Sequence, residues 1–307
     1  MAAHAQGTPS WVEAQLPDIE AGRRFYGGLF GWSFDTERHE ALLGGRRVAG
    51  IIPKRDGRMP TTWTLYLAAT DAGTVAARVK AAGGRMVMEP YPVGPFGVRA
   101  LASDPGGAVF GVRQAGDENG FAVTGEPGTF CWVEVHTREP DAVDTFYAAV
   151  FGWLGHPQGG PAAPSPTAEY RLWSPPGTRD PGADTAFGGR AVMPAAVPAA
   201  FPGHLLVHFA ARDCDETCDA ATRLGARVVL APRDTPHGRT AVLDDDQGAR
   251  FAILTRPPRP PRPPRPPRQP RQPRPPQSSR PPRQPRQPRP PQPSRPPHDQ
   301  GTSPGQC

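Results

Sequence analysis

The sequence lacks paired cysteines, long apolar runs and the common catalytic motifs, and each absence excludes a class of protein. The four cysteines form no CxxC pairs and no disulfide framework, and Cys214 and Cys218 lie on a predicted helical stripe as small core residues. No apolar run approaches the roughly 18 residues of a membrane-spanning helix. The N-terminus does not resemble a secretion signal, so we expect a cytoplasmic protein that makes no membrane contact. GxSxG, GxxxxGK[ST] and HExxH are all missing.

What the sequence does contain is a long internal repeat. Residues 7–32, GTPSWVEAQLPDIEAGRRFYGGLFGW, return as GTFCWVEVHTREPDAVDTFYAAVFGW at residues 128–153. Similar matches continue to residue 255, and a repeat of this length indicates a duplicated fold unit. We therefore predict a first domain at residues 7–115, a linker at 116–127 and a second domain at 128–255.

Each domain is predicted to contain two units of a strand, a helix and three strands, which gives an α+β fold. Asp18 is a typical N-cap before an amphipathic stripe, and Gly31 is a typical helix stop. In the second copy Pro140 suits a first helical turn and Gly152 ends the helix. The aromatic residues on these stripes are expected to pack in the core.

Residues 256–307 have a different composition from the rest of the chain. They contain twelve arginines and one acidic residue, so the tail has a net charge of +11 and the preceding 255 residues have a net charge of −5. Without apolar residues this segment cannot build a core, and we expect it to be disordered. Arginine at every third position of a polyproline II helix could bind a polyanion, and PxxPxR motifs suit a polyproline-binding groove. A tail without function, expanded by slippage in GC-rich DNA, is the third interpretation.

The repeated FYGGLFGW and FYAAVFGW segments, together with DPGGAVF near the end of the first copy, resemble the vicinal oxygen chelate superfamily. That superfamily includes glyoxalases, bleomycin-resistance proteins and extradiol dioxygenases, and the resemblance is to its tandem, actinobacterial branch. It implies that two strand-helix-strand-strand-strand modules curl into a cupped mixed sheet in each domain. It also implies a divalent metal that polarises vicinal oxygens.

The metal ligands that the resemblance implies are absent from the aligned positions. The first-strand histidine falls on Trp11 and Trp132, and the fifth-strand ligand falls on Thr64 and Leu206. The glutamate of the last strand falls on Gly111 and Ala252. Except for threonine, none of these residues has a side chain that could ligate a metal, so we expect no resident cofactor.

The side chains that share strand faces with these positions are the candidate ligand-binding residues. They are aromatic or polar: Trp11, Glu13, Thr64, Tyr66, Trp132, Glu134, His136, His204 and His208. A cup lined in this way suits a small aromatic or hydrophobic metabolite or drug. Glu13 and Glu134 are candidate general bases if desolvated. As an alternative, His136, His204, His208 and Glu134 could hold a relocated divalent metal in a lyase, isomerase or dioxygenase-like enzyme.

Overall fold

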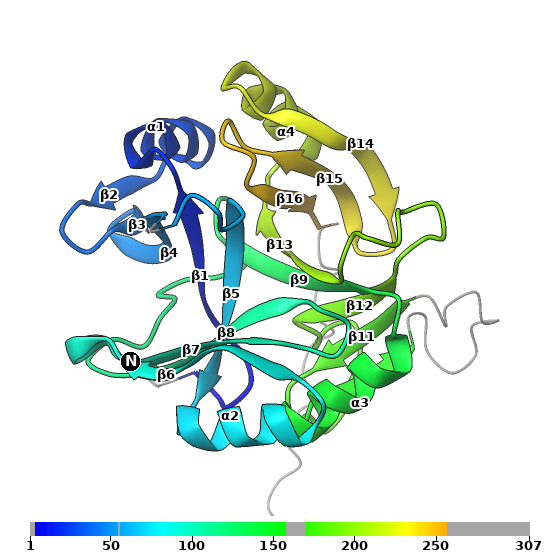
Figure 1. Ribbon diagram of the computed structural model, residues 1–307. Helices are drawn as coiled ribbons and strands as arrows, with labels where there is room; N and C mark the ends of the chain where they lie inside the picture. The colour runs from blue at the N-terminus through cyan, green and yellow to red at the C-terminus, as the bar shows by residue number, and fades with distance from the viewer. Residues whose placement is uncertain (1–3, 55, 158–169, 257–307) are drawn as a thin grey trace, which may run out of the picture. The chain divides into compact units, whose positions relative to one another are not determined.

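The computed structural model describes residues 4–54, 56–157 and 170–256, and its first half contains two successive units of one helix and four strands (Figure 1). The first unit consists of β1 (Pro9–Leu16), α1 (Ile19–Phe30), β2 (Ser33–Asp35), β3 (Glu40–Leu43) and β4 (Arg46–Pro53). The second consists of β5 (Thr62–Ala69), α2 (Ala72–Ala81), β6 (Arg85–Pro92), the short 3-10 helix η1 (Gly94–Phe96), β7 (Gly97–Ser103) and β8 (Val109–Ala115).

The second half repeats both units in the same order. Its first unit consists of β9 (Phe130–Thr137), α3 (Pro140–Phe151), β10 (Leu154–Pro157), β11 (Tyr170–Ser174) and β12 (Gly188–Val192). Its second unit consists of β13 (His204–Ala210), α4 (Cys214–Arg223), β14 (Arg227–Thr235), β15 (Gly238–Asp244) and β16 (Arg250–Thr255). The predicted α+β fold of two tandem domains is confirmed.

Each domain forms one eight-stranded mixed sheet, and the two sheets have equivalent strand orders. The orders are β2-β3-β4-β1-β5-β8-β7-β6 and β10-β11-β12-β9-β13-β16-β15-β14. In the first sheet β1 and β5 are antiparallel neighbours, with Glu13 opposite Thr64. In the second sheet β9 and β13 pair in the same way, with Glu134 opposite Leu206. The two units of a domain therefore meet at a central strand pair that carries the duplicated Trp and Glu.

The helix ends follow the capping chemistry of the sequence. Asp18 accepts a hydrogen bond from the backbone N–H of Ala21, and Gly31 ends α1 at a φ of 72°. Pro140 occupies the first turn of α3, and Gly152 ends that helix at the same φ. Only glycine adopts this left-handed conformation at little cost, which explains the stop at both positions.

The two domains share one continuous hydrophobic core. Helix α1 lies beside α4, and α2 lies beside α3, so each helix contact joins one domain to the other (Figure 1). The ring of Phe30 in α1 lies 5.3 Å from that of Phe209 in β13. The linker also joins this core, since Phe121 is buried and its ring lies 5.2 Å from that of Phe130.

Four polar contacts reinforce the interface between the domains, in two equivalent pairs. The Tyr26 hydroxyl donates to Asp245 at 2.8 Å, and the Tyr147 hydroxyl donates to Asp104 at 3.2 Å. The indole N–H groups of Trp32 and Trp153 donate to the carbonyls of Gly128 and Gly7, at 2.8 and 2.7 Å. Asp104 and Asp245, at equivalent turns between the last two strands of each domain, thus each bind a helix of the other domain.

The remaining sequence predictions concern cysteine, membranes and the tail. Cys214 and Cys218 are free thiols buried in α4, as their helical stripe predicted. No helix in the described ranges is long and apolar enough to cross a membrane. The predicted disorder of residues 256–307, and their binding to a polyanion or a polyproline groove, concern a segment that lies outside the described residues apart from Arg256.

Candidate functional site

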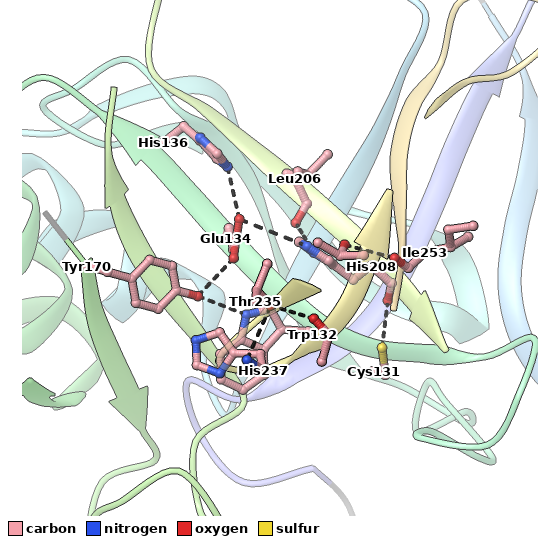
Figure 2. A network of polar contacts seen from close by, with 12 residues as sticks. Cys131, Trp132, Glu134, His136, Tyr170, Leu206, His208, Thr235, His237 and Ile253 are labelled. Carbon is pink, nitrogen blue, oxygen red and sulfur yellow. Dashed lines mark hydrogen bonds and ion pairs between the residues drawn. The ribbon is translucent and has the colours of Figure 1, made fainter. Parts of the chain in front are cut away.

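The second domain contains a cavity of about 230 Å³ on the concave face of its sheet. Trp132 and Glu134 reach it from β9, because residues two apart on a strand point to the same face. Tyr170 enters from β11 and His237 from the turn between β14 and β15 (Figure 2). The remaining lining is largely apolar and includes Leu206, Leu230, Val242 and Leu254.

Glu134 is the centre of a hydrogen-bond network at this cavity (Figure 2). The Tyr170 hydroxyl donates to its Oε1 at 2.9 Å, and the same hydroxyl accepts from the Trp132 indole N–H at 3.1 Å. His136 Nε2 lies 3.1 Å from Glu134 Oε2, and His208 Nε2 lies 4.0 Å from the same oxygen. The network fixes the orientation of the glutamate and of both aromatic rings.

A glycine makes this arrangement sterically accessible. Gly189 on β12 lies opposite Glu134 in the register, and a Cβ there would lie 2.7 Å from the hydroxyl oxygen of Tyr170. A side chain at this position would therefore displace the tyrosine from the carboxylate. The equivalent glycine of the first domain, Gly50, lies opposite Glu13, and a Cβ there would lie 3.1 Å from the Glu13 Cγ atom.

The electrostatics of the cavity favour an ionised Glu134. Burial opposes ionisation of Glu134, but the hydrogen bond from His136 and the nearby imidazole of His208 outweigh it and lower the pKa of the carboxyl to about 2. Burial lowers the pKa of His208 and also that of His237. A carboxylate with so low a pKa is a hydrogen-bond acceptor and a weak base. The role of Glu134 as a general base stays a prediction.

His204 belongs to the edge of this cluster. Its ring stacks on that of His136 at 4.9 Å, and its Nδ1 lies 3.4 Å from the carbonyl oxygen of Pro202. Burial and the neighbouring His136 lower the pKa of His204 to about 4. The structure therefore brings His136, His208 and Glu134 together and places His204 behind His136, away from the cavity lining.

The first domain contains an equivalent cavity of about 320 Å³ with a different, strongly charged lining. Trp11 and Glu13 line it from β1. Glu13 Oε2 accepts from Arg99 at 2.7 Å, and its Oε1 accepts from the Tyr66 hydroxyl at 3.2 Å. Tyr66 and Thr64 are themselves buried behind this lining. Glu13 is thus held in an ion pair with Arg99, and its role as a general base stays a prediction.

Comparison with known proteins identifies the fold and the family. Residues 132–254 match the family described as the glyoxalase-like domain. The chain is 36% identical over 267 residues to the "Putative glyoxylase CFP32" of Mycobacterium tuberculosis, an alignment that covers 83% of this chain and 97% of that protein. It is 34% identical over 278 residues to the "Anthracycline biosynthesis protein DnrV" of Streptomyces peucetius, with 83% of this chain and 95% of that protein covered. The chain belongs to the glyoxalase-like family of the vicinal oxygen chelate superfamily.

Solved structures of this superfamily share the fold at low sequence identity. The Mn(II)-bound glyoxalase of Novosphingobium aromaticivorans has a TM-score of 0.54 and 16% identity, with 81% of this chain and 82% of that chain covered. Homoprotocatechuate 2,3-dioxygenase of Arthrobacter globiformis has a TM-score of 0.57 and 13% identity, with 83% and 81% covered. The likeness extends over both domains of the glyoxalase-like chain.

The metal implied by the superfamily does not fit the side chains at the aligned positions. In the second domain these positions are Trp132, Leu206 and Ala252. His208, two residues after Leu206, lies opposite Trp132 on β9 and opposite Ala252 on β16, so the only imidazole at this point of the described sheet has an indole and a methyl group as its register partners. Among the described residues, no group of three or more histidine, cysteine, aspartate or glutamate side chains is arranged to hold a metal ion. The alternative ligand set consists of His136, His204, His208 and Glu134. In this set the Glu134 carboxylate is hydrogen-bonded to His136, and the Nδ1 atom of His204 faces the carbonyl oxygen of Pro202.

The sequence patterns did not predict several residues that line the two cavities. Tyr170 follows the insertion that interrupts the repeat, and His237 lies in a turn, so neither belongs to the duplicated strand faces. Arg99 and Arg113 lie on duplicated strands, and their parity relative to the turn at Asp104 could have identified them. Alternate residues of β7 and β8 point to the same face of the sheet, as they do on β1 and β5.

Proposed function

We propose that the second-domain cup of this glyoxalase-like protein binds a small aromatic molecule that carries a hydrogen-bond donor, without a resident metal. The observation that carries the proposal is the set of aromatic rings around one cavity. The His237 ring lies 5.1 Å from both the Trp132 and the Tyr170 rings, at interplanar angles of 34° and 40° (Figure 2). Such rings offer flat apolar contact and a preferred stacking geometry to an aromatic ligand.

The buried carboxylate supplies the polar part of the recognition. Glu134 accepts from His136 and Tyr170, and an ionised carboxylate has about four acceptor positions, so capacity remains for a ligand hydroxyl or amine. Because the site is largely desolvated, a ligand that lacks a donor leaves this acceptor capacity unused. We therefore expect donor-bearing aromatic compounds to bind better than their methylated analogues.

The relatives support a small organic ligand. One is named as a glyoxylase and another as a protein of anthracycline biosynthesis, and both align with nearly their full length. The cavity of about 230 Å³ limits such a ligand to a compact molecule.

Calorimetric titration with 2-naphthol and 2-methoxynaphthalene tests this function. We expect 2-naphthol to bind at least about tenfold more tightly, since one hydrogen bond to a charged acceptor contributes roughly 1.5 to 3 kcal/mol. Trp132→Leu should weaken 2-naphthol binding about tenfold or more, which corresponds to 1.4 kcal/mol. Trp11→Leu alters the duplicate position in the other cup and is the matched control. Equal affinities in wild type and Trp132→Leu would refute the proposal.

A metal-dependent lyase, isomerase or dioxygenase-like reaction is the second candidate. The observation in its favour is that the His136 and His208 imidazoles both approach the Glu134 carboxylate, within 3.1 and 4.0 Å. Elemental analysis of the purified full chain, before and after incubation with zinc, iron, manganese and nickel, separates the two candidates. Near-stoichiometric metal that is lost in His208→Ala would favour the enzyme, whereas chelator-insensitive naphthol binding would favour the metal-free binder.

A further inference from the structure

Two arginines face each other directly in the cup of the first domain. Arg99 on β7 and Arg113 on β8 are register partners in an antiparallel pair, and both line the cavity of about 320 Å³. Like charges directly opposite each other on neighbouring strands destabilise a sheet. An arrangement of this kind needs a compensating negative charge.

Only one of the two arginines has a close carboxylate partner among the described residues. Arg99 donates to Glu13 at 2.7 Å. Arg113 is 5% exposed, and its guanidinium donates to the backbone carbonyl of Glu118 at 2.8 Å, with no carboxylate of the described chain within 4.0 Å. Burial and the charges of Arg99 and Arg47 lower the pKa of Arg113, and these effects exceed the attraction of more distant acids. A buried cation with no carboxylate close by is costly, because one hydrogen bond to a neutral carbonyl does not offset the loss of its hydration.

Unsatisfied donors mark the same cavity. The Nε atoms of Arg99 and Arg113 are both buried without a hydrogen-bond partner in the described structure. The Nδ1 atom of His39 is a third buried polar atom without a partner there, and it is a donor or an acceptor according to the tautomer; His39 also lines this cavity. Its backbone has a φ of 56°, which is uncommon for a residue with a side chain. Buried donors that lack a protein acceptor are expected to meet an acceptor on a ligand or on ordered water.

The duplication supplies an internal comparison. Counted from the turn aspartates Asp104 and Asp245, Arg99 corresponds to Thr240 and Arg113 to Leu254. Thr240 and Leu254 are also register partners, and both line the second cavity. The two cups therefore keep the same backbone and the same Trp and Glu on the first strand, but only the first cup carries the arginine pair.

We propose that the first-domain cup is a separate binding site for a small organic monocarboxylate, whose carboxylate is held at Arg113 and whose apolar body contacts Trp11 and Phe96. The guanidinium fork matches a carboxylate in a bidentate geometry. Trp11 and Phe96 lie in the same lining as Arg113. Of the arginines in this lining, Arg38 and Arg99 have a carboxylate within 4.0 Å in the described structure, and Arg113 has none. Glu13, Glu37, Glu40 and Glu118 also line the cavity and oppose the binding of any anion, and they oppose a dianion such as phosphate more strongly than a monoanion.

Titration of the full chain with benzoate and its neutral isostere benzamide tests the site. We expect benzoate to bind at least tenfold more tightly than benzamide, and more tightly than inorganic phosphate. Arg113→Leu places the residue of the duplicate position in the first cup and should abolish the preference for benzoate. Arg113→Gln is the second variant, since its amide can still donate to the Glu118 carbonyl. Both variants should retain wild-type binding of 2-naphthol, which reports on the other cup.

Trp132→Leu is the matched control, because it alters only the second cup and should leave the benzoate preference unchanged. Equal affinity of wild type for benzoate and benzamide would overturn the proposal, as would a preference that persists in both Arg113 variants. Tighter binding of phosphate than of benzoate would overturn the carboxylate assignment. Failure of naphthol binding with intact benzoate selectivity would refute the proposed function of the second cup alone.

Discussion

Glu40 shows how a single buried acid couples the first cup to pH. Burial and a hydrogen bond with Glu118 raise the pKa of Glu40 to about 7, against the attraction of Arg47 and Arg38. The carboxyl is therefore protonated more readily in the folded than in the unfolded protein. Its contribution to stability is complete below about pH 4.5 and is lost as the pH rises through 7.

Replacement of Glu40 by glutamine should remove this pH dependence. Glu40→Gln keeps a donor for Glu118 and has no charge to bury, so we expect it to be more stable than wild type at pH 8, by about 1 kcal/mol after allowance for solvent screening. At pH 5 the two proteins should be nearly equal in stability. Urea unfolding at both pH values measures the difference. Glu89→Gln alters an exposed acid paired with Lys80 and is the control, which should follow the wild-type curve. A constant gap between Glu40→Gln and wild type at both pH values would contradict this assignment.

At the scale of elements, helices α1 and α3 each bind a turn of the other domain through a tyrosine. In the described structure the Tyr147 hydroxyl makes one hydrogen bond, which it donates to Asp104. The Tyr26 hydroxyl makes two: it donates to Asp245 and accepts from the Trp63 indole N–H at 2.9 Å. Removing a hydroxyl leaves each buried partner short of one bond, at about 1 to 3 kcal/mol per group. The loss of the tyrosine hydroxyl should therefore lower the free energy of unfolding by different amounts in the two equivalent helices.

Tyr26→Phe should destabilise the protein more than Tyr147→Phe does. The first variant deprives two buried groups of a partner and the second deprives one. Urea unfolding at pH 7.5 gives both free energies of unfolding, with the two variants serving as controls for each other. Equal losses would mean that the indole of Trp63 finds another acceptor.

The sequence predicted the elements better than it predicted the cup linings. Periodicity, caps and the repeat located α1, α3 and the central strands, since these depend on local pattern. The candidate residues Trp11, Glu13, Trp132 and Glu134 do line cavities, because strand parity determines which face they share. Tyr170 and His237 depend on how an insertion and a turn fold over the sheet, and no local pattern encodes that path. The proposed roles of these residues stay predictions.

At the scale of the whole molecule, the duplication has produced two domains that each complete the other's core. Aromatic residues of α1 contact the second sheet, with the Phe25 and Phe251 rings 6.4 Å apart. Aromatic residues of α3 contact the first sheet, with the Tyr147 and Phe110 rings 5.8 Å apart. The described residues between 4 and 256 belong to one compact unit, and the linker residue Phe121 is part of its core. Separate cores would permit separate unfolding, but a shared core does not.

We therefore expect the two domains to unfold in one cooperative transition. The calorimetric enthalpy of unfolding should equal the van't Hoff enthalpy, as two-state behaviour requires. Tyr26→Phe, which weakens the interface between the domains, should lower the temperature of this single transition without splitting it. Differential scanning calorimetry of wild type and variant makes the measurement, and the fluorescence of the six tryptophans should follow the same curve because they lie in both domains. Two resolved transitions in wild type would show that each cup is built on an independently stable domain, and would contradict the shared core as the source of stability.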